Sequence, residues 1–336
     1  MNIAIDAMGG DQAPGVNVQG ALLARSELGV NLTLVGDERL IRKELGKDGN
    51  RDSSIRIHHC SQMVAMDELP LKVLRHRKDV SIMVAFDLAR RGDVDAVVSA
   101  GNSGATVGAA VLTLGRLKGV ERPALAGVFP GAKGNVVLID VGANVDTKPR
   151  QLFEFGIMGD IFTRSLFNID NPKVGILNIG QEGSKGNEQV RIAHELFKKG
   201  PFNFVGNVEG RDVFSGDVQV IVSDGFVGNV ALKLSEGMAE TIDVMFKREM
   251  SKSLISKLGF WLSGRAFEDF KRNLDYTEHG GAPLLGVKGV GIICHGDSSP
   301  KAIKNAIRIA IDFVNNHVKE RLEEGLAAFQ TKGNER

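Results

Sequence analysis

Cysteine is scarce in this sequence of 336 residues, which holds only Cys60 and Cys294 and no C-x-x-C pair. A disulfide scaffold or a zinc ribbon needs more thiols at closer spacing, so both classes are excluded. An excess of either charge is also missing, because 42 Lys and Arg residues are balanced by 41 Asp and Glu residues. This balance argues against a protein that binds nucleic acid through a broad basic surface. We therefore expect a protein of a reducing cytoplasm with no nucleic-acid partner.

Export and membrane-spanning signals are missing as well. The N-terminal sequence MNIAIDAMGGD has no basic region, and Asp6 interrupts its apolar run, so it predicts a first strand and not a signal peptide. Residues 96–115 carry no charge and are long enough to suggest a membrane span. Four glycines and several Ser, Thr and Asn residues interrupt that segment. It is better interpreted as a strand, a turn and a helix of small residues.

Three common catalytic motifs are absent from the chain. There is no G-x-x-x-x-G-K-[ST], which argues against a P-loop nucleotidase. A G-x-G-x-x-G after a strand is absent too, which argues against a dinucleotide site. The G-x-S-x-G elbow of many serine hydrolases is also missing. Any catalysis therefore has to use other residues.

What the sequence does contain is an alternation of short apolar runs and helical patterns. Runs that are apolar on both faces are typical of buried, mostly parallel strands, and helical patterns between them predict a Rossmann-like αβα sheet. Strands are predicted at 2–6, 31–37, 55–60, 94–100, 134–142, 173–180, 202–206, 218–225 and 290–296. Helices are predicted at 79–91, 103–118, 152–167, 187–199 and 298–326. The pattern predicts a single α/β domain over residues 1–336.

The segment 225–282 departs from this alternation. Two helical patterns at about 226–258 and 261–274 follow each other without a strand, which predicts a projecting helical hairpin inserted at about 226–275. Apolar residues with basic neighbours lie around the connection, a combination typical of interfacial anchoring at a membrane. The same residues would also suit a dimer interface, and both interpretations stay open. They are Leu254, Leu258, Phe260, Trp261 and Leu262.

One sequence motif occurs twice in the chain. GDVDAVVSAGNSG at 92–104 and GDVQVIVSDGFVG at 216–228 are identical at seven of 13 positions. Glycine lets the backbone turn tightly, and a helix that starts just after the turn presents N–H groups to an anion such as phosphate. We interpret the two copies as anion-holding turns that face one cleft or bind two parts of one substrate. A plain strand-to-helix corner is the alternative for either copy.

Polar residues and glycines follow the predicted strand ends, where open parallel sheets bind ligands. The predicted substrate-binding residues are Asp6, Gly9, Gly10, Ser99, Gly101, Asn102, Ser103, Gly104, Gly142, Asn144, Asp224, Gly225 and Gly228. The predicted catalytic residues are Lys185, Asn229 and His295. Each has a simpler interpretation: a solvated loop lysine, a turn asparagine and a histidine that satisfies a backbone carbonyl. No spacing indicates a metal site, no cofactor is expected, and the two cysteines are expected to be structural.

Taken in order, these motifs resemble the phosphate acyltransferase family of bacterial phospholipid synthesis, over nearly the whole chain. The resemblance departs mildly at Val80, where a second small polar residue is expected. It implies a fold akin to phosphate acetyltransferases and isocitrate-type dehydrogenases, and a homodimer. The segments that carry it are IAIDAMGGD (3–11), SAGNSGAT (99–106), DVGAN (140–144), GILNIGQEGSKGN (175–187), GNVEGRD (206–212), SDGFVGNVALK (223–233), GGAPLLGV (280–287) and CHGDS (294–298).

The resemblance also implies an activity. A long-chain acyl group would pass from acyl-acyl carrier protein to inorganic phosphate, so phosphate itself would be the nucleophile and no Ser–His pair would be needed. The protein would be cytoplasmic, with peripheral contact at the inner face of the cell membrane, where a later enzyme uses the acyl phosphate. Two alternatives remain: a short-chain phosphate acyltransferase that depends on coenzyme A, and a non-catalytic scaffold that binds carrier protein.

Overall fold

The computed structural model describes residues 1–252 and 280–334. Its strands form one 11-stranded sheet in the order β3-β2-β1-β4-β11-β10-β5-β6-β9-β7-β8. Seven of the ten strand pairs are parallel, and the antiparallel pairs join β11 to β10, β10 to β5 and β5 to β6. The predicted mostly parallel α/β architecture is therefore confirmed. The division into domains stays a prediction, although one sheet runs through the whole molecule.

All nine predicted strands are present. They are β1 (Asn2–Asp6), β2 (Asn31–Gly36), β3 (Ile55–His59), β4 (Ala96–Ser99), β6 (Gly134–Ile139), β7 (Lys173–Leu177), β8 (Asn203–Val208), β9 (Val220–Val222) and β11 (Gly291–Ile293). Two further strands, β5 (Ala124–Gly131) and β10 (Ala282–Leu285), were not predicted. Both contain a proline, Pro130 or Pro283, and proline argues against a strand in sequence analysis because it has no N–H to donate.

Helices are present at four of the five places predicted between strands, 79–91, 103–118, 152–167 and 187–199, and three further helices, Gly15–Leu28, Glu38–Gly49 and Pro70–His76, lie outside the predicted ranges. The described elements are α1 (Gly15–Leu28), α2 (Glu38–Gly49), α3 (Pro70–His76), α4 (Ser81–Arg91), α5 (Ser103–Thr113), α6 (Pro149–Phe167), α7 (Glu188–Phe197), the short 3₁₀ helix η1 (Gly210–Phe214), α8 (Gly225–Met250), α11 (Pro300–Asn315) and α12 (Val318–Asn334). The single helix predicted at 298–326 was wrong, because the chain breaks between α11 and α12, where His317 has a φ of 52°. α8 is the first helix of the predicted hairpin, and the second lies outside the described residues. Within the described residues, none of the helices combines the length and apolar character of a membrane span.

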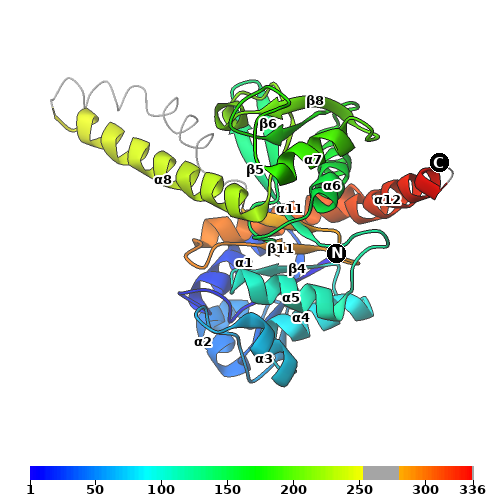
Figure 1. The fold of residues 1–336 in the computed structure, drawn as a ribbon. Helices are drawn as coiled ribbons and strands as arrows, with labels where there is room; N and C mark the ends of the chain where they lie inside the picture. Colours follow the sequence, from blue (N-terminus) through cyan, green and yellow to red (C-terminus); the bar gives the residue numbers. More distant parts are fainter. Residues whose placement is uncertain (253–279, 335–336) are drawn as a thin grey trace.

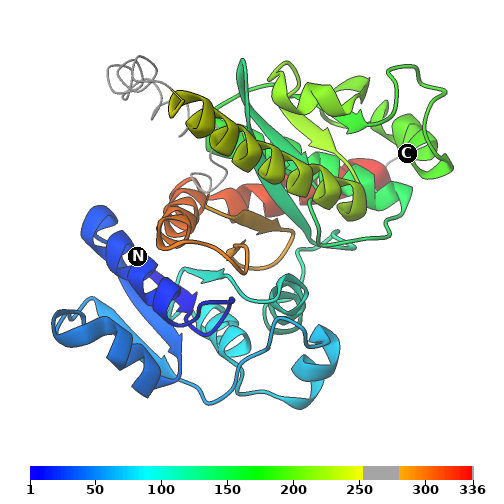
Figure 2. The same ribbon diagram turned by 90° about the vertical axis from the view of Figure 1, so that its left-hand side faces the viewer.

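Strand β10 joins the two lobes that Figures 1 and 2 show above and below the centre of the sheet. Its first two residues, Ala282 and Pro283, pair with Ile293 and Ile292 of β11. Its last two residues, Leu284 and Leu285, pair with β5. The short ladders on either side let the lobes diverge, and loops from both lobes meet beside β10.

The repeated motif occupies equivalent places in the two lobes. In the first lobe β4 pairs with β1, so that Asp6 lies opposite Ser99 before α5 begins. In the second lobe β9 pairs with β6, and the backbone N–H of Asp140 donates to the carbonyl of Ser223 just before α8. The duplicated sequence thus builds the same strand, turn and helix start twice, once in each lobe.

Gly228 provides a test of this packing. A Cβ at Gly228 would overlap the carbonyl oxygen of Asp140. A Cβ at Gly237, on the same helix, would meet nothing within 4 Å. We expect Gly228→Ala to lower the free energy of unfolding by about 1–3 kcal/mol through overpacking. The matched variant Gly237→Ala should raise it by about 0.5–1 kcal/mol, because alanine is the better helix former. Urea unfolding measures both. Equal effects of the two substitutions would contradict the packing of α8 on the turn after β6.

Candidate active site

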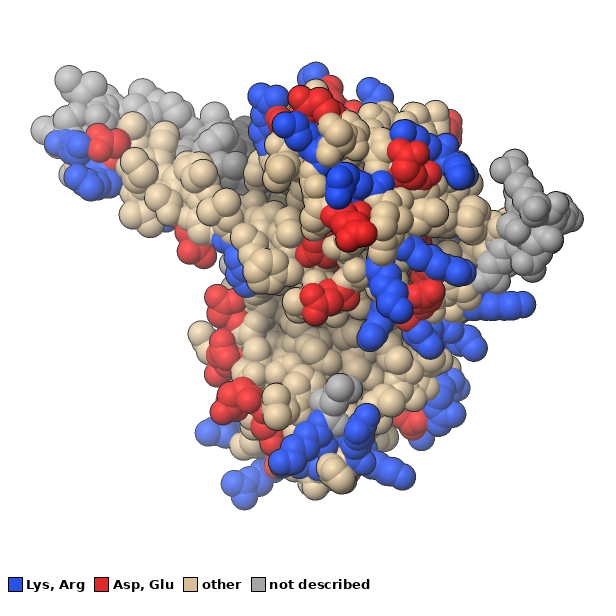
Figure 3. Space-filling model, viewed as in Figure 1, with Lys and Arg blue, Asp and Glu red and all other residues tan. Residues whose placement is uncertain are grey.

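A cavity of about 120 Å³ lies where the two lobes meet. Four predicted site residues line it: Ser103 at the start of α5, Gly142 after β6, Asn229 on α8 and His295 after β11. The rest of the wall is largely apolar and includes Leu125, Val128, Val141, Leu232, Ala282, Ile293 and Ala302. Figure 3 shows a hollow between the lobes in which most of the visible atoms belong to uncharged residues. Such a site suits a ligand with one polar and one apolar part.

The two copies of the motif differ at the residue that caps the helix. Asn102 caps α5, where its Oδ1 accepts from the backbone N–H of Ala105 at 3.0 Å. Asp224 caps α8, where its Oδ1 accepts from Val227 N–H at 2.8 Å. A carboxylate at a helix N-terminus repels a second anion, whereas a neutral asparagine leaves the positive end of the dipole available. The start of α5, where Ser103 and Gly104 lie, is therefore the better anion site.

The turn that begins with Asp140 is built around the buried carboxylate of that residue. Its Oδ1 accepts from the backbone N–H groups of Leu125, Gly142 and Ala143, and its Oδ2 accepts from the backbone and side-chain N–H groups of Asn144. Burial raises the pKa of Asp140, and these donors oppose the rise. The side chain of Asn144 also donates to the carbonyl of Pro123 at 2.7 Å. Asn144 therefore holds the turn in place, and its side-chain N–H groups point to protein acceptors.

The equivalent turn in the first lobe is equally tight. Ser99 donates from its hydroxyl to Asp6 Oδ2 at 2.8 Å and accepts from the N–H of Gly101 at 3.1 Å. Burial raises the pKa of Asp6, and its hydrogen bonds, including the one from Ser99, oppose the rise. A Cβ at Gly9 would lie 2.7 Å from the nitrogen of Gly101, so the two turns can pack only with glycine there. Gly10 adopts a φ of 103°, a conformation that favours glycine.

Asn229 connects α8 to the turn after β6. Its Nδ2 donates to the carbonyl of Val141 at 3.1 Å. A Cβ at Gly142 would lie 2.8 Å from that same nitrogen, so Gly142 is the residue that lets the asparagine approach. The other N–H and the Oδ1 of Asn229 are oriented by this bond, on a side chain that lines the cavity.

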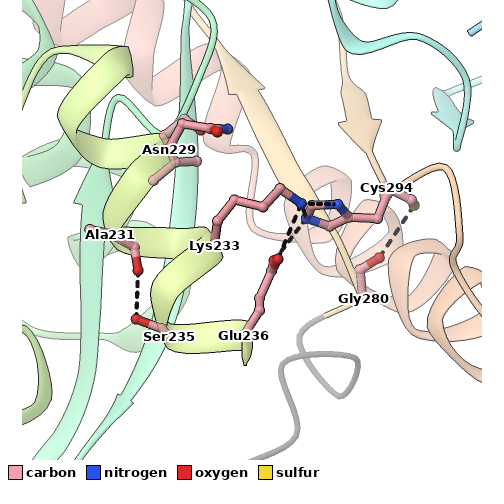
Figure 4. A network of polar contacts seen from close by, with 9 residues as sticks. Asn229, Ala231, Lys233, Ser235, Glu236, Gly280 and Cys294 are labelled. Atoms are coloured by element: carbon pink, nitrogen blue, oxygen red, sulfur yellow. Dashed lines mark hydrogen bonds and ion pairs between the residues drawn. The ribbon is translucent and has the colours of Figure 1, made fainter. Parts of the chain in front are cut away.

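A polar network that sequence analysis missed lies next to Asn229 (Figure 4). The Nζ of Lys233 lies 3.2 Å from Oε2 of Glu236 and 2.8 Å from Nδ1 of His295. Nε2 of His295 lies 2.8 Å from Oε1 of Glu236. Burial raises the pKa of the Glu236 carboxyl, but His295 and Lys233 outweigh this and lower it overall. The signal in the sequence was the spacing of positions 229, 233 and 236, which places the three residues on one face of a helix.

The network also fixes the histidine. An ammonium group only donates, so Nδ1 of His295 accepts from Lys233, and a neutral ring then carries its hydrogen on Nε2, toward Glu236. Both ring nitrogens are engaged with the protein in this arrangement. The ammonium of Lys233 uses two of its three donors on these partners, and the third can serve an anion. Lys233 is thus a stronger candidate for binding an anion than His295.

The two thiols are not nucleophiles. Burial raises the pKa of Cys294 to about 12, and its Sγ donates to the carbonyl of Gly280 at 3.3 Å. Burial, with a smaller contribution from Asp6, raises the pKa of Cys60 to about 12 as well. A thiolate is the reactive form, so both cysteines are structural, as the sequence predicted.

Other predicted residues lie outside the cavity. Gly225 and Gly228 pack against the turn after β6, and Lys185 is exposed in the loop after β7, outside the residues that line the cavity. The catalytic role of Lys185 therefore stays a prediction. The apolar cluster predicted to contact a membrane, Leu254, Leu258, Phe260, Trp261 and Leu262, lies outside the described residues. In residues 1–252 and 280–334 no group of three or more His, Cys, Asp or Glu side chains is arranged to hold a metal ion.

Comparison with known proteins gives consistent matches over nearly the full length. The family model described as fatty acid synthesis protein matches residues 1–321. A protein named phosphate acyltransferase from Geotalea daltonii is 51% identical over 328 residues, which cover 96% of this chain and 95% of the relative. A solved phosphotransacetylase from Streptococcus pyogenes has a similar fold, with a TM-score of 0.62, 18% identity and 94% of each chain covered. A 4-hydroxythreonine-4-phosphate dehydrogenase from Klebsiella pneumoniae has a TM-score of 0.54 at 14% identity, with 94% of this chain and 99% of that chain covered. The two solved structures support the fold alone.

Proposed function

Because the chain belongs to the fatty acid synthesis protein family together with phosphate acyltransferases, and is therefore an acyltransferase enzyme, we propose that acyl-acyl carrier protein is its donor. The acyl group is long, the acceptor is inorganic phosphate, and the product is an acyl phosphate for phospholipid synthesis. The observation that carries this proposal is the cavity between the lobes. It brings together the start of α5, the amide of Asn229, and Glu236 and His295, the two lining residues that contact Lys233.

The reaction needs no covalent intermediate with the enzyme. An oxygen of hydrogen phosphate attacks the thioester carbonyl carbon, a tetrahedral oxyanion forms, and the carbon–sulfur bond then breaks. The proton of hydrogen phosphate ends on the departing thiol, so atoms and charge balance. The protein has to hold two reactants together, which is worth at most about 7–11 kcal/mol, and to stabilise the oxyanion.

The residues divide these tasks between the lobes. The N–H groups at the start of α5, near Ser103, hold the phosphate, and Lys233 neutralises charge as the bond forms. Asn229 donates to the oxyanion from the N–H that does not bind Val141. His295 and Glu236 hold Lys233 in position. The predicted contribution of Lys185 remains part of the proposal as a second cation that approaches from the loop after β7.

The exposed face of α8 carries apolar residues that could contact a second copy of the chain. An apolar stripe runs along the helix on one face: Val227, Val230, Leu234, Met238 and Met245, with Leu234 68% exposed. Figure 1 shows α8 projecting away from both lobes, and in Figure 3 its basic residues gather near its far end. We propose that this stripe packs on a second copy of the chain in a homodimer. Leu254, Leu258, Phe260, Trp261 and Leu262, which lie outside the described residues, are proposed to contact the inner face of the cell membrane, with the enzyme otherwise in the cytoplasm.

The donor and acceptor are tested by mixing the protein with palmitoyl-acyl carrier protein, with and without inorganic phosphate. Free carrier thiol and palmitoyl phosphate should appear together, and only with phosphate, when both are quantified by mass spectrometry. Turnover of coenzyme A thioesters in place of the carrier thioester would favour the short-chain alternative. Carrier protein that binds without reacting would overturn the proposed activity.

Lys233→Met tests the proposed anion-binding lysine. We expect the catalytic efficiency for phosphate to fall about 100-fold, mainly through a higher KM for phosphate, because a charged donor is lost from the site. Lys198→Met is the matched control, since Lys198 forms a similar pair with Glu195 three residues before it on α7, with Nζ and Oε1 2.7 Å apart. A Lys233→Met enzyme within threefold of the wild type would exclude this role.

Leu234→Glu tests the apolar stripe. Placing a carboxylate in a buried helix interface should shift the protein from dimer to monomer in sedimentation equilibrium at micromolar concentration. Glu240→Lys, a charge change on the same helix away from the stripe, should leave the association unchanged. If Leu234→Glu stays dimeric but loses binding to vesicles of anionic phospholipid, the stripe contacts lipid and the dimer proposal is wrong.

A further inference from the structure

A second cavity, of about 400 Å³, lies directly beside the first. Val128 of β5 lines both cavities and is part of the wall between them. The neighbouring strand contributes in the same way, since Ala282 of β10 lines the first cavity and Pro283 lines the second. The two cavities are therefore adjacent compartments on either side of a thin wall.

The wall is thin because the sheet opens at this point. The β5–β10 ladder consists of Leu284 with Leu125 and Leu285 with Ala124, and it ends there. Continued register would place Pro283 opposite Ala126, but proline has no N–H to donate. Beyond that point Gly127 and Val128 of β5 pair with β6 but not with β10, and both residues line the first cavity. The gap is thus a consequence of a proline in a four-residue strand.

Helix α11 forms a wall common to both compartments. Ala302 in its first turn lines the first cavity, and Ile309 lines the second. The rise of an α-helix separates these two residues by about 10 Å along the axis. The compartments therefore follow one another along α11, leading away from Ser103 and His295 and toward the end of α6.

The second compartment has a mixed lining of apolar and polar residues. Its apolar lining comes from α6, α11 and the two strands: Phe162, Leu166, Phe167, Ile309, Val128 and Pro283. Asn168, Arg308, Asp312 and Asn316 provide the polar part of the lining. The apolar part of this compartment adjoins the polar site at Val128, which suits a long hydrocarbon chain whose reactive end stays in that site.

We propose that the acyl chain of the substrate passes Val128 and lies in this second compartment, and that Val128 and Ile309 set the preferred chain length. The proposal rests on the acyl transfer described above. Short acyl groups fit in the first cavity alone, and the distal methylenes of a long chain bury themselves against Phe167 and Ile309. Each buried methylene adds to binding, so the second compartment is what favours long chains.

Two variants test the proposal from either side of the wall. Val128→Phe places a larger side chain between the two cavities. Ile309→Phe reduces the volume of the second cavity, and Ile309 does not line the first. The measurement is the ratio of kcat/KM for palmitoyl-acyl carrier protein to that for hexanoyl-acyl carrier protein, with phosphate saturating. Each variant should lower this ratio at least tenfold, because small changes in an apolar pocket discriminate by that order. Turnover of the hexanoyl thioester shows at the same time that Ile309→Phe, whose residue does not line the first cavity, is folded, and urea unfolding provides this check for Val128→Phe.

Val205→Phe is the matched control, since Val205 is 42% exposed on β8 and lines neither cavity. It should leave the ratio unchanged. If the wild type reacts but Val128→Phe and Ile309→Phe lower both substrates equally or neither, the acyl-chain compartment is excluded while the acyl transfer stands. If the wild type converts neither thioester in the presence of phosphate, the proposed function itself fails.

Discussion

The four residues of β10 are the constraint on which the site depends. Two of them pair with β11 of the first lobe and two pair with β5 of the second, so the lobes are held at a fixed offset by very few backbone hydrogen bonds. A longer strand would align the lobes along a full ladder and fill the space beside Pro283. The short ladders leave room for the polar site and for the apolar compartment next to it.

The two lobes share the same strand, turn and helix start, but the residues that cap their helices differ. Asn102 keeps the start of α5 free of negative charge, while Asp224 makes the start of α8 unsuitable for a second anion. The second copy contributes side chains farther along its helix, at Asn229 and Lys233. Under the proposed function, the repeat provides complementary halves of one site, with backbone N–H groups from the first lobe and the side chains of Asn229 and Lys233 from the second.

Much of the frame could be predicted from the sequence, because buried parallel strands are continuous apolar runs and their ends are marked by Gly, Asn and Asp. β5 and β10 could not be predicted, because Pro130 and Pro283 lack the N–H that a strand residue normally donates. The residues Asn102, Asn144 and Asp224 were located correctly at turns, but their side chains cap helices or hold a turn. The contact of Lys233 with His295, 62 residues away, depends on how the lobes meet, which no local pattern encodes.

Helix α8 joins the reaction site to a distant surface through one rigid element. Asn229, Lys233 and Glu236 lie within its first four turns, and its 26 residues span about 39 Å in all. Because α8 is continuous, its far end and Lys233 belong to one rigid element. Under the proposed function, a contact made at the far end of α8 would therefore act on the position of Lys233 relative to the start of α5.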